Sequence, residues 1–171
     1  MKGEEESLQV ASFSPSPFTL YPSRMNEIPA SGRILALDWG ELRIGLALSD
    51  ETQLLASPLG TLVRRRGKRF PMPRFLELIA GHQPVGLVVG LPLALDGSDS
   101  ESTRAARELA ALVAERTRLP VELWDERLTT ARALRAIREQ GGSTRGRKDA
   151  VDALAASVLL QHVLDTRRNP A

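Results

Sequence analysis

The sequence contains no cysteine and only two histidines, His82 and His162. The lack of cysteine excludes disulfides, zinc-thiolate sites and thiol nucleophiles, which leaves oxygen and scarce imidazole groups for any site chemistry. No apolar run approaches the roughly 20 residues that a membrane helix needs, and residues 4–6 are glutamates where a signal peptide would be basic. We therefore expect a cytoplasmic protein with no membrane segment.

The length and composition predict one globular domain with a tail. The chain has 171 residues, of which 42% are hydrophobic and 26% charged, and this is the ordinary range for a folded domain. Residues 1–32 contain Ser-Pro-Ser-Pro, Tyr-Pro and Ile-Pro and few aliphatic residues at helix or strand spacing. We expect a flexible N-terminal extension over 1–32 and a folded domain over 33–168.

Three strands are predicted at the start of the domain. An apolar run at 34–37 ends at Asp38-Trp39-Gly40, and a second strand at 43–49 follows almost at once. So short a connection requires an antiparallel hairpin. A third strand at about 56–63 extends the same meander.

Helices and strands then alternate, which indicates parallel pairing. Apolar spacing predicts a helix from residue 73 to about 81, a buried strand at 85–91, a helix at 101–118 and a strand at 121–124. Two more helices are expected, at about 129–140 and 149–167. The expected fold class is α/β, a mixed five-stranded sheet with three antiparallel strands followed by two parallel ones, flanked by helices.

Acidic residues lie at places that bring them together. Asp38 ends an otherwise apolar strand, and Asp125 and Glu126 end another, so at least one of this pair should reach the same sheet edge. In the last helix Asp152 shares the apolar stripe of Ala155, Ala156, Leu159 and Val163. An ionised carboxylate on a core-facing stripe is costly unless it is paired or bound to a metal.

A cluster of carboxylates suits metal-assisted phosphodiester cleavage. Hard oxygen ligands favour Mg²⁺ or Mn²⁺, and two such ions can activate water and stabilise a leaving oxygen. The spacing alone fits a second interpretation equally well, in which Asp38 is a turn residue, Asp125 or Glu126 pairs with Arg127, and Asp152 is a capping acid. Asp149 is expected to cap the last helix.

Four ordered segments of the domain carry short motifs. They are Leu35-Ala36-Leu37-Asp38-Trp39-Gly40 with Arg43-Ile44-Gly45-Leu46-Ala47, then Val88-Val89-Gly90-Leu91-Pro92 with Asp96-Gly97, then Asp125-Glu126-Arg127-Leu128-Thr129-Thr130, and finally Lys148 with Asp152, Ala155 and Ala156. Over about residues 33–165 they resemble, in the right order, the motifs of the YqgF/RuvX family, relatives of the Holliday junction resolvases.

The resemblance implies a ribonuclease H-like fold and a nuclease, dependent on Mg²⁺ or Mn²⁺, that processes the 5′ end of the 16S ribosomal RNA precursor. By position, Asp38 is the first-strand acid, Glu126 or its neighbour Asp125 the second, and Asp152 the final-helix acid. The catalytic candidates are therefore these four residues, with Asp38, Glu126 and Asp152 as metal ligands.

Basic residues provide candidates for contacts with nucleic acid. Clusters at 64–69 and 145–148 could neutralise phosphates, although a solvated basic surface has the same composition. The candidates are Arg43, Arg64, Arg65, Arg66, Arg107, Arg127 and Lys148.

Three other functions remain open. The same acids would serve a resolvase of four-way DNA junctions, and monomer and homodimer are both possible. Asp-x-Gly after a strand also opens the phosphate loop of sugar kinases and actin-like ATPases, but those folds repeat the motif and this chain has one copy. A non-catalytic RNA-binding factor of ribosome assembly is the third.

Overall fold

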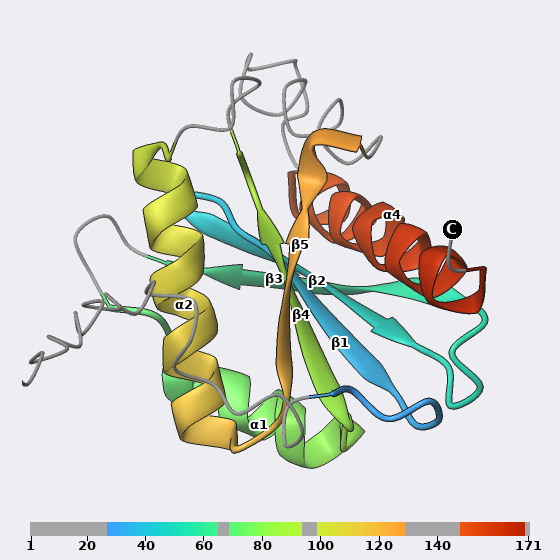
Figure 1. Cartoon of the computed structure of the whole chain (residues 1–171). Helices are drawn as coiled ribbons and strands as arrows, with labels where there is room; N and C mark the ends of the chain where they lie inside the picture. Colours follow the sequence, from blue (N-terminus) through green and yellow to red (C-terminus); the bar gives the residue numbers. More distant parts are fainter. Residues whose placement is uncertain (1–26, 65–68, 94–98, 129–147, 170–171) are drawn as a thin grey trace, which may run out of the picture.

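A computed structural model describes residues 27–64, 69–93, 99–128 and 148–169 of the chain (Figure 1). The elements are β1 (Ile34–Asp38), β2 (Arg43–Ser49), β3 (Ala56–Val63), α1 (Met72–His82), β4 (Gly86–Leu91), α2 (Glu101–Thr117), β5 (Val121–Asp125), the 3-10 turn η1 (Glu126–Leu128) and α4 (Lys148–Arg168). The helix expected at 129–140 lies outside the described residues. None of the helices in the described ranges has the length and apolar character needed to cross a membrane.

The five strands form one sheet in the order β3-β2-β1-β4-β5. β2 pairs antiparallel with both β1 and β3, whereas β4 pairs in parallel with β1 and β5. The predicted mixed sheet is thereby confirmed. Because of these directions, β1, β3, β4 and β5 all end at one edge of the sheet, which we call the carboxyl edge.

Helices cover both faces of the sheet. α2 packs on β4 and β5, while α4 crosses β3, β2 and β1 on the other face (Figure 1). Side chains alternate along β1, so that Leu35 and Leu37 face the α2 side whereas Ile34 and Ala36 face α4. This burial on both faces explains why β1 is an unbroken apolar run.

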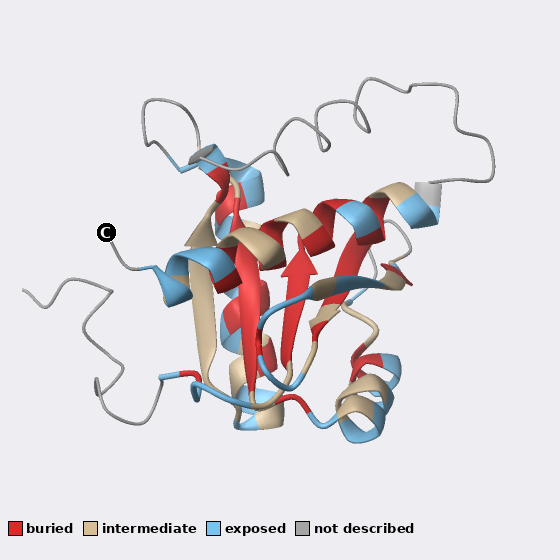
Figure 2. Cartoon of the chain, turned by 90° about the vertical axis from the view of Figure 1, so that its right-hand side faces the viewer, coloured by how far each residue is buried: buried red, intermediate tan, exposed pale blue. Residues whose placement is uncertain are grey.

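α4 contributes much of the core on its face of the sheet. Figure 2 shows that α4 is mostly buried or intermediate where it crosses the strands and exposed mainly toward its two ends. Leu159, Leu160, Val163 and Leu164 are each at most 1% exposed, and burial of each contributes about 1.5–3 kcal/mol. The small residues Ala155 and Ala156 let the helix lie close to the sheet. The expected apolar stripe, with Asp152 on it, is confirmed.

The start of α2 is fixed to the end of β4. The Ser100 hydroxyl accepts a hydrogen bond from the Thr103 N–H (3.1 Å), and the Thr103 hydroxyl accepts one from the Ser100 N–H (3.2 Å), forming a capping box. The Thr103 hydroxyl also donates to the Pro92 carbonyl (2.5 Å). These bonds hold the first turn of α2 at the carboxyl edge.

Residues just before β1 pack on the domain. Ile28 is 5% exposed, lies against Gly86, and its carbonyl accepts a hydrogen bond from Arg167 (2.8 Å). The Gln53 side-chain amide donates to the carbonyls of Pro29 and Gly32. The described core therefore includes residues from the segment 1–32, which we predicted to be a flexible N-terminal extension.

Candidate active site

Asp38 ends β1 on the face of the sheet that α4 covers. By the alternation of side chains along the strand it faces the same way as Ile34 and Ala36, and the residue is 1% exposed. Ionising an acid that is buried at the end of an apolar strand is costly unless hydrogen-bonding or charged groups interact with it. The surroundings of Asp38 therefore decide what it can do.

Glycines on the two neighbouring strands make room around Asp38. Gly45 of β2 pairs directly with Asp38, and a Cβ at Gly45 would overlap the main-chain carbonyl of Asp152. On the other side Gly90 follows Val89, the register partner of Leu37, and a Cβ there would overlap the Glu126 carboxylate. The two glycines thus let Asp152 and Glu126 approach the sheet on either side of Asp38.

The structure separates the adjacent acids Asp125 and Glu126. Glu126 begins the turn η1, is 2% exposed and lies over Gly90. Asp125 instead pairs with Arg127, whose Nη2 lies 2.6 Å from its Oδ2. The hydrogen bond from the Arg127 side chain lowers the pKa of Asp125. Glu126, not Asp125, is therefore the acid that lies beside Asp38.

Asp152 reaches the same region from the second turn of α4. Its side chain is fully buried, and its Oδ2 accepts a hydrogen bond from Arg43 Nε (3.0 Å). The same guanidinium forms an ion pair through Nη2 with Asp149. Asp149 lies in the first turn of α4, and its expected role as the cap of this helix stays a prediction.

The three buried acids offer carboxylate oxygens, which are suitable ligands for a hard divalent cation. All are carboxylates, whereas His82 lies at the other end of the sheet and His162 packs against the Trp124 ring. Within the described ranges, no three acidic or histidine side chains form a ready-made metal cage. Mg²⁺ sites ordinarily need only one or two carboxylates, with waters and substrate phosphates supplying the other ligands.

The basic candidates in the described ranges lie at the carboxyl edge. Arg64 follows β3, donates to the Glu41 carbonyl (2.8 Å) and places its guanidinium 4.6 Å from the Trp39 ring centre. Arg107 pairs with Asp99 at 3.1 Å near the start of α2, and Arg127 follows β5. Arg65, Arg66 and the side chain of Lys148 lie outside the described residues.

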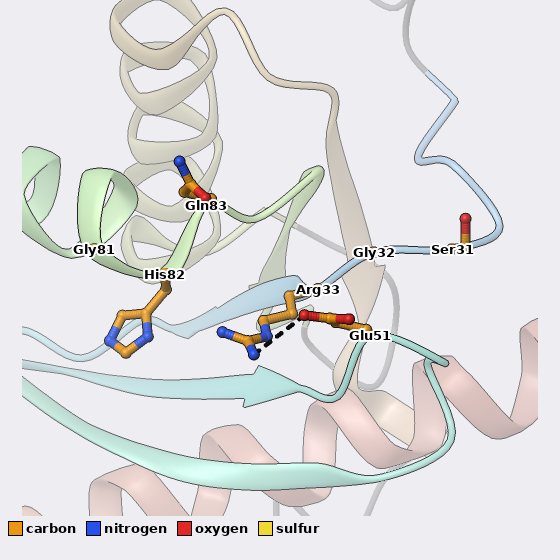
Figure 3. Close-up of a pocket in the computed structure, with 7 residues that line it drawn as sticks. All are labelled: Ser31, Gly32, Arg33, Glu51, Gly81, His82 and Gln83. Carbon is orange, nitrogen blue, oxygen red and sulfur yellow. Dashed lines mark hydrogen bonds and ion pairs between the residues drawn. The ribbon is translucent and has the colours of Figure 1, made fainter.

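A pocket lies at the opposite end of the sheet (Figure 3). Its lining includes Arg33 and Glu51, which form an ion pair at 3.3 Å, and His82 at the end of α1. Arg33 precedes β1 and Asp38 ends it, so the pocket and Asp38 are separated by a whole strand, about 15 Å. None of the catalytic candidates lines this pocket.

Sequence reasoning left two features of the site without a role. Gly45 and Gly90 belong to the sequence motifs, but the motifs do not specify what the two glycines do in the packing. The available signal was a glycine inside an apolar strand, which often marks a close approach of another chain segment. The Arg43 contact with two acids on α4 had no such local signal.

Comparison with solved structures defines the class of fold. The chain superposes on Thermus thermophilus RuvC in complex with a Holliday junction substrate with a TM-score of 0.51 and 18% identity, over 81% of this chain and 96% of that one. Together with the strand order, this likeness shows a ribonuclease H-like fold, as predicted.

The family follows from sequence comparison. Residues 32–166 match the family model described as "RuvX: Holliday junction resolvase". A protein of Koribacter versatilis (strain Ellin345) named "Putative pre-16S rRNA nuclease" is 46% identical over 80% of this chain and 88% of its own length. Proteins of the same name from Ruegeria sp. (strain TM1040) and Anaeromyxobacter sp. (strain Fw109-5) are 39% and 45% identical, over 83% and 79% of this chain and 90% and 98% of their own. The chain belongs to the RuvX family, as the resemblance implied.

Proposed function

We propose that the chain is a metal-dependent nuclease that hydrolyses phosphodiester bonds at the carboxyl edge, with Asp38, Glu126 and Asp152 as its acidic residues. The observation that carries this proposal is the burial of three carboxylates, from β1, η1 and α4, around two glycines. Membership of the RuvX family and the nuclease names of its relatives support it.

The chain's own residues would bind the metal and the substrate in different ways. Asp38 and Glu126, with Asp152 from α4, would hold Mg²⁺ or Mn²⁺ through their carboxylate oxygens. A divalent cation bound there would activate water and stabilise the leaving oxygen. Arg64, Arg107 and Arg127 at the rim would hold the phosphates of the flanking strand.

The substrate we favour is the 5′ end of the 16S ribosomal RNA precursor, acted on in the cytoplasm. The name shared by the relatives supports this choice. A four-way DNA junction is the second candidate, because the matching family model is described as a Holliday junction resolvase. A non-catalytic role in ribosome assembly ranks third. For the oligomeric state, both a monomer and a homodimer stay predictions.

The test is cleavage by the purified full chain of a 16S precursor leader RNA and of an immobile four-way DNA junction, each with Mg²⁺, with Mn²⁺ and with EDTA. We expect metal-dependent cutting of the leader RNA and no cutting with EDTA. Cutting of the junction alone would favour the resolvase. Cutting of neither substrate, by a protein that still binds the RNA, would contradict the nuclease proposal and favour the assembly factor.

A further inference from the structure

Arg43 connects the sheet to the first two turns of α4 through two acids of very different exposure. Its Nε donates to the Asp152 carboxylate, which is 0% exposed, and its Nη2 pairs with the Asp149 carboxylate, which is 69% exposed. Arg43 itself is 29% exposed in its side chain. One guanidinium therefore holds a buried acid and a solvated acid at the same time.

The two contacts have different physical weight. A buried carboxylate needs a charged or hydrogen-bonding partner, because desolvation otherwise disfavours its ionised form. An exposed pair such as Arg43 with Asp149 contributes little stability by itself. A planar guanidinium with five N–H donors can keep one carboxylate while it releases another.

A divalent cation at Asp152 would change this balance. A guanidinium and a cation on one carboxylate repel each other strongly at short range in a site of low dielectric constant. Asp149 lies one turn earlier on α4, on the solvent side of Arg43, and can retain the guanidinium there. Arg43 therefore has an acidic partner in both states, Asp152 and Asp149 before a metal ion binds Asp152 and Asp149 alone afterwards.

We propose, building on the nuclease function above, that Arg43 is a positioning residue that holds Asp152 in the metal-free protein and competes with a divalent cation for it. Asp149 is the acid to which the guanidinium is transferred on metal binding. Arg43 thereby acts on the metal site, and this role is separate from the phosphate contact that the sequence suggested for it.

The test is calorimetric titration of Mn²⁺ into the full-length protein without nucleic acid. In R43Q the Mn²⁺ affinity should rise about tenfold, because the competing cation is gone. In D149N it should fall about fivefold, because the guanidinium then stays on Asp152. Adding D149N to R43Q should have almost no further effect, which gives the coupling of a double-mutant cycle.

R33Q is the matched control, since it removes the same charge from the Arg33–Glu51 pair at the other end of the sheet. It should leave Mn²⁺ affinity unchanged. Unchanged or weaker binding in R43Q, or an equal effect of D149N in both backgrounds, would overturn the inference while the nuclease proposal stands. Failure of the wild-type protein to bind Mn²⁺ without nucleic acid would overturn the inference, whereas the nuclease proposal is tested separately by the cleavage assay with RNA present. If R43Q does not melt cooperatively, an unchanged affinity in D149N overturns the inference.

Discussion

At the scale of single residues, the glycines beside Asp38 matter as much as the acids. Gly45 is the register partner of Asp38 on β2, Gly90 follows the register partner of Leu37 on β4, and each glycine is covered by a group from a candidate acid. A side chain at either position would occupy the space that Asp152 or Glu126 now fills. Asp152 and Glu126 can therefore lie close to Asp38 because the two glycines beside it have no side chains.

Gly90→Ala should abolish most cleavage while the protein stays folded. The new methyl group would overlap the Glu126 carboxylate, which must then move away from Asp38. Misplacement of a catalytic group by about 1 Å can cost about a hundredfold in rate, and we expect at least that loss in kcat for the leader RNA. Gly81→Ala, at a site in α1 with nothing within 4 Å, is the matched control and should keep full activity. Wild-type kcat in folded G90A would contradict the placement of Glu126.

Local sequence signals identified the acids but not their partners. Asp38 and Asp152 could be predicted because a strand end and a helix stripe are readable from spacing. The choice between Asp125 and Glu126 could not, because it depends on where β5 gives way to η1. The contact of Arg43 with Asp152 joins residues 109 apart in the sequence, and no periodic pattern encodes it.

At the scale of elements, the position of α4 depends on its contact with β2. The carbonyl of Asp152 lies over Gly45, so helix and strand backbones approach without a side chain between them. Gln161 adds a second link, accepting a hydrogen bond from the Ala56 N–H at 2.9 Å and donating to the Leu54 carbonyl at 3.0 Å. The first link places Asp152, and the second fixes the helix along β3.

Gly45→Ala should destabilise the fold, because the added methyl group would meet backbone and not a flexible side chain. Overpacking of this kind costs about 1–3 kcal/mol, and urea unfolding followed by circular dichroism would measure it. Gly81→Ala, in a helix, should be neutral or stabilising by up to about 1 kcal/mol. An equal free energy of unfolding for G45A and wild type would mean that α4 does not rest on β2 as described.

β1 and β4 were predictable because each is a short apolar run, and α1, α2 and α4 because apolar residues recur in them at helical spacing. Ser100 and Thr103 have the spacing of a capping box, but the usual Glu or Gln is replaced by Thr103, which makes the motif of α2 harder to recognise from sequence. Its hydrogen bond to the Pro92 carbonyl joins α2 to the end of β4, and such a link appears only in three dimensions. The helix expected at 129–140 stays a prediction.

For the whole molecule, stability should decline in acid through carboxylates that accept hydrogen bonds in the folded state. Asp50 accepts from the Leu55 and Leu54 N–H groups (2.9 and 2.8 Å) and from the Thr52 hydroxyl. The bond from Leu55, followed by that from Thr52, lowers the pKa of Asp50 from 3.8 to about 2. Hydrogen bonds from Arg127 and from Gln161 lower the pKa of Asp125 and Asp165 as well.

Because these folded-state pKa values are depressed, their stabilisation is complete above about pH 4 and is lost as the pH falls toward 2. The free energy of unfolding should therefore decrease over that interval. Asp50→Asn should make the decrease shallower, since the amide does not titrate. Urea unfolding at several pH values would measure both slopes, with E51Q as the neighbouring control for the loss of one charge. An identical slope in D50N would contradict the hydrogen bonds described for Asp50.

The central claim is that three buried acids are retained for metal-dependent cleavage, and Asp38→Asn tests it most directly. The measurement is the rate of leader RNA cleavage with Mn²⁺, alongside the melting temperature, for wild type, D38N and D165N, the last a matched substitution on the far part of α4. We expect D38N to lose more than about 1,000-fold in rate, since a metal ligand supplies several kcal/mol to the transition state. Its melting temperature should be unchanged or higher, because a buried charge has been removed. A folded D38N protein that cleaves at the wild-type rate would contradict the claim.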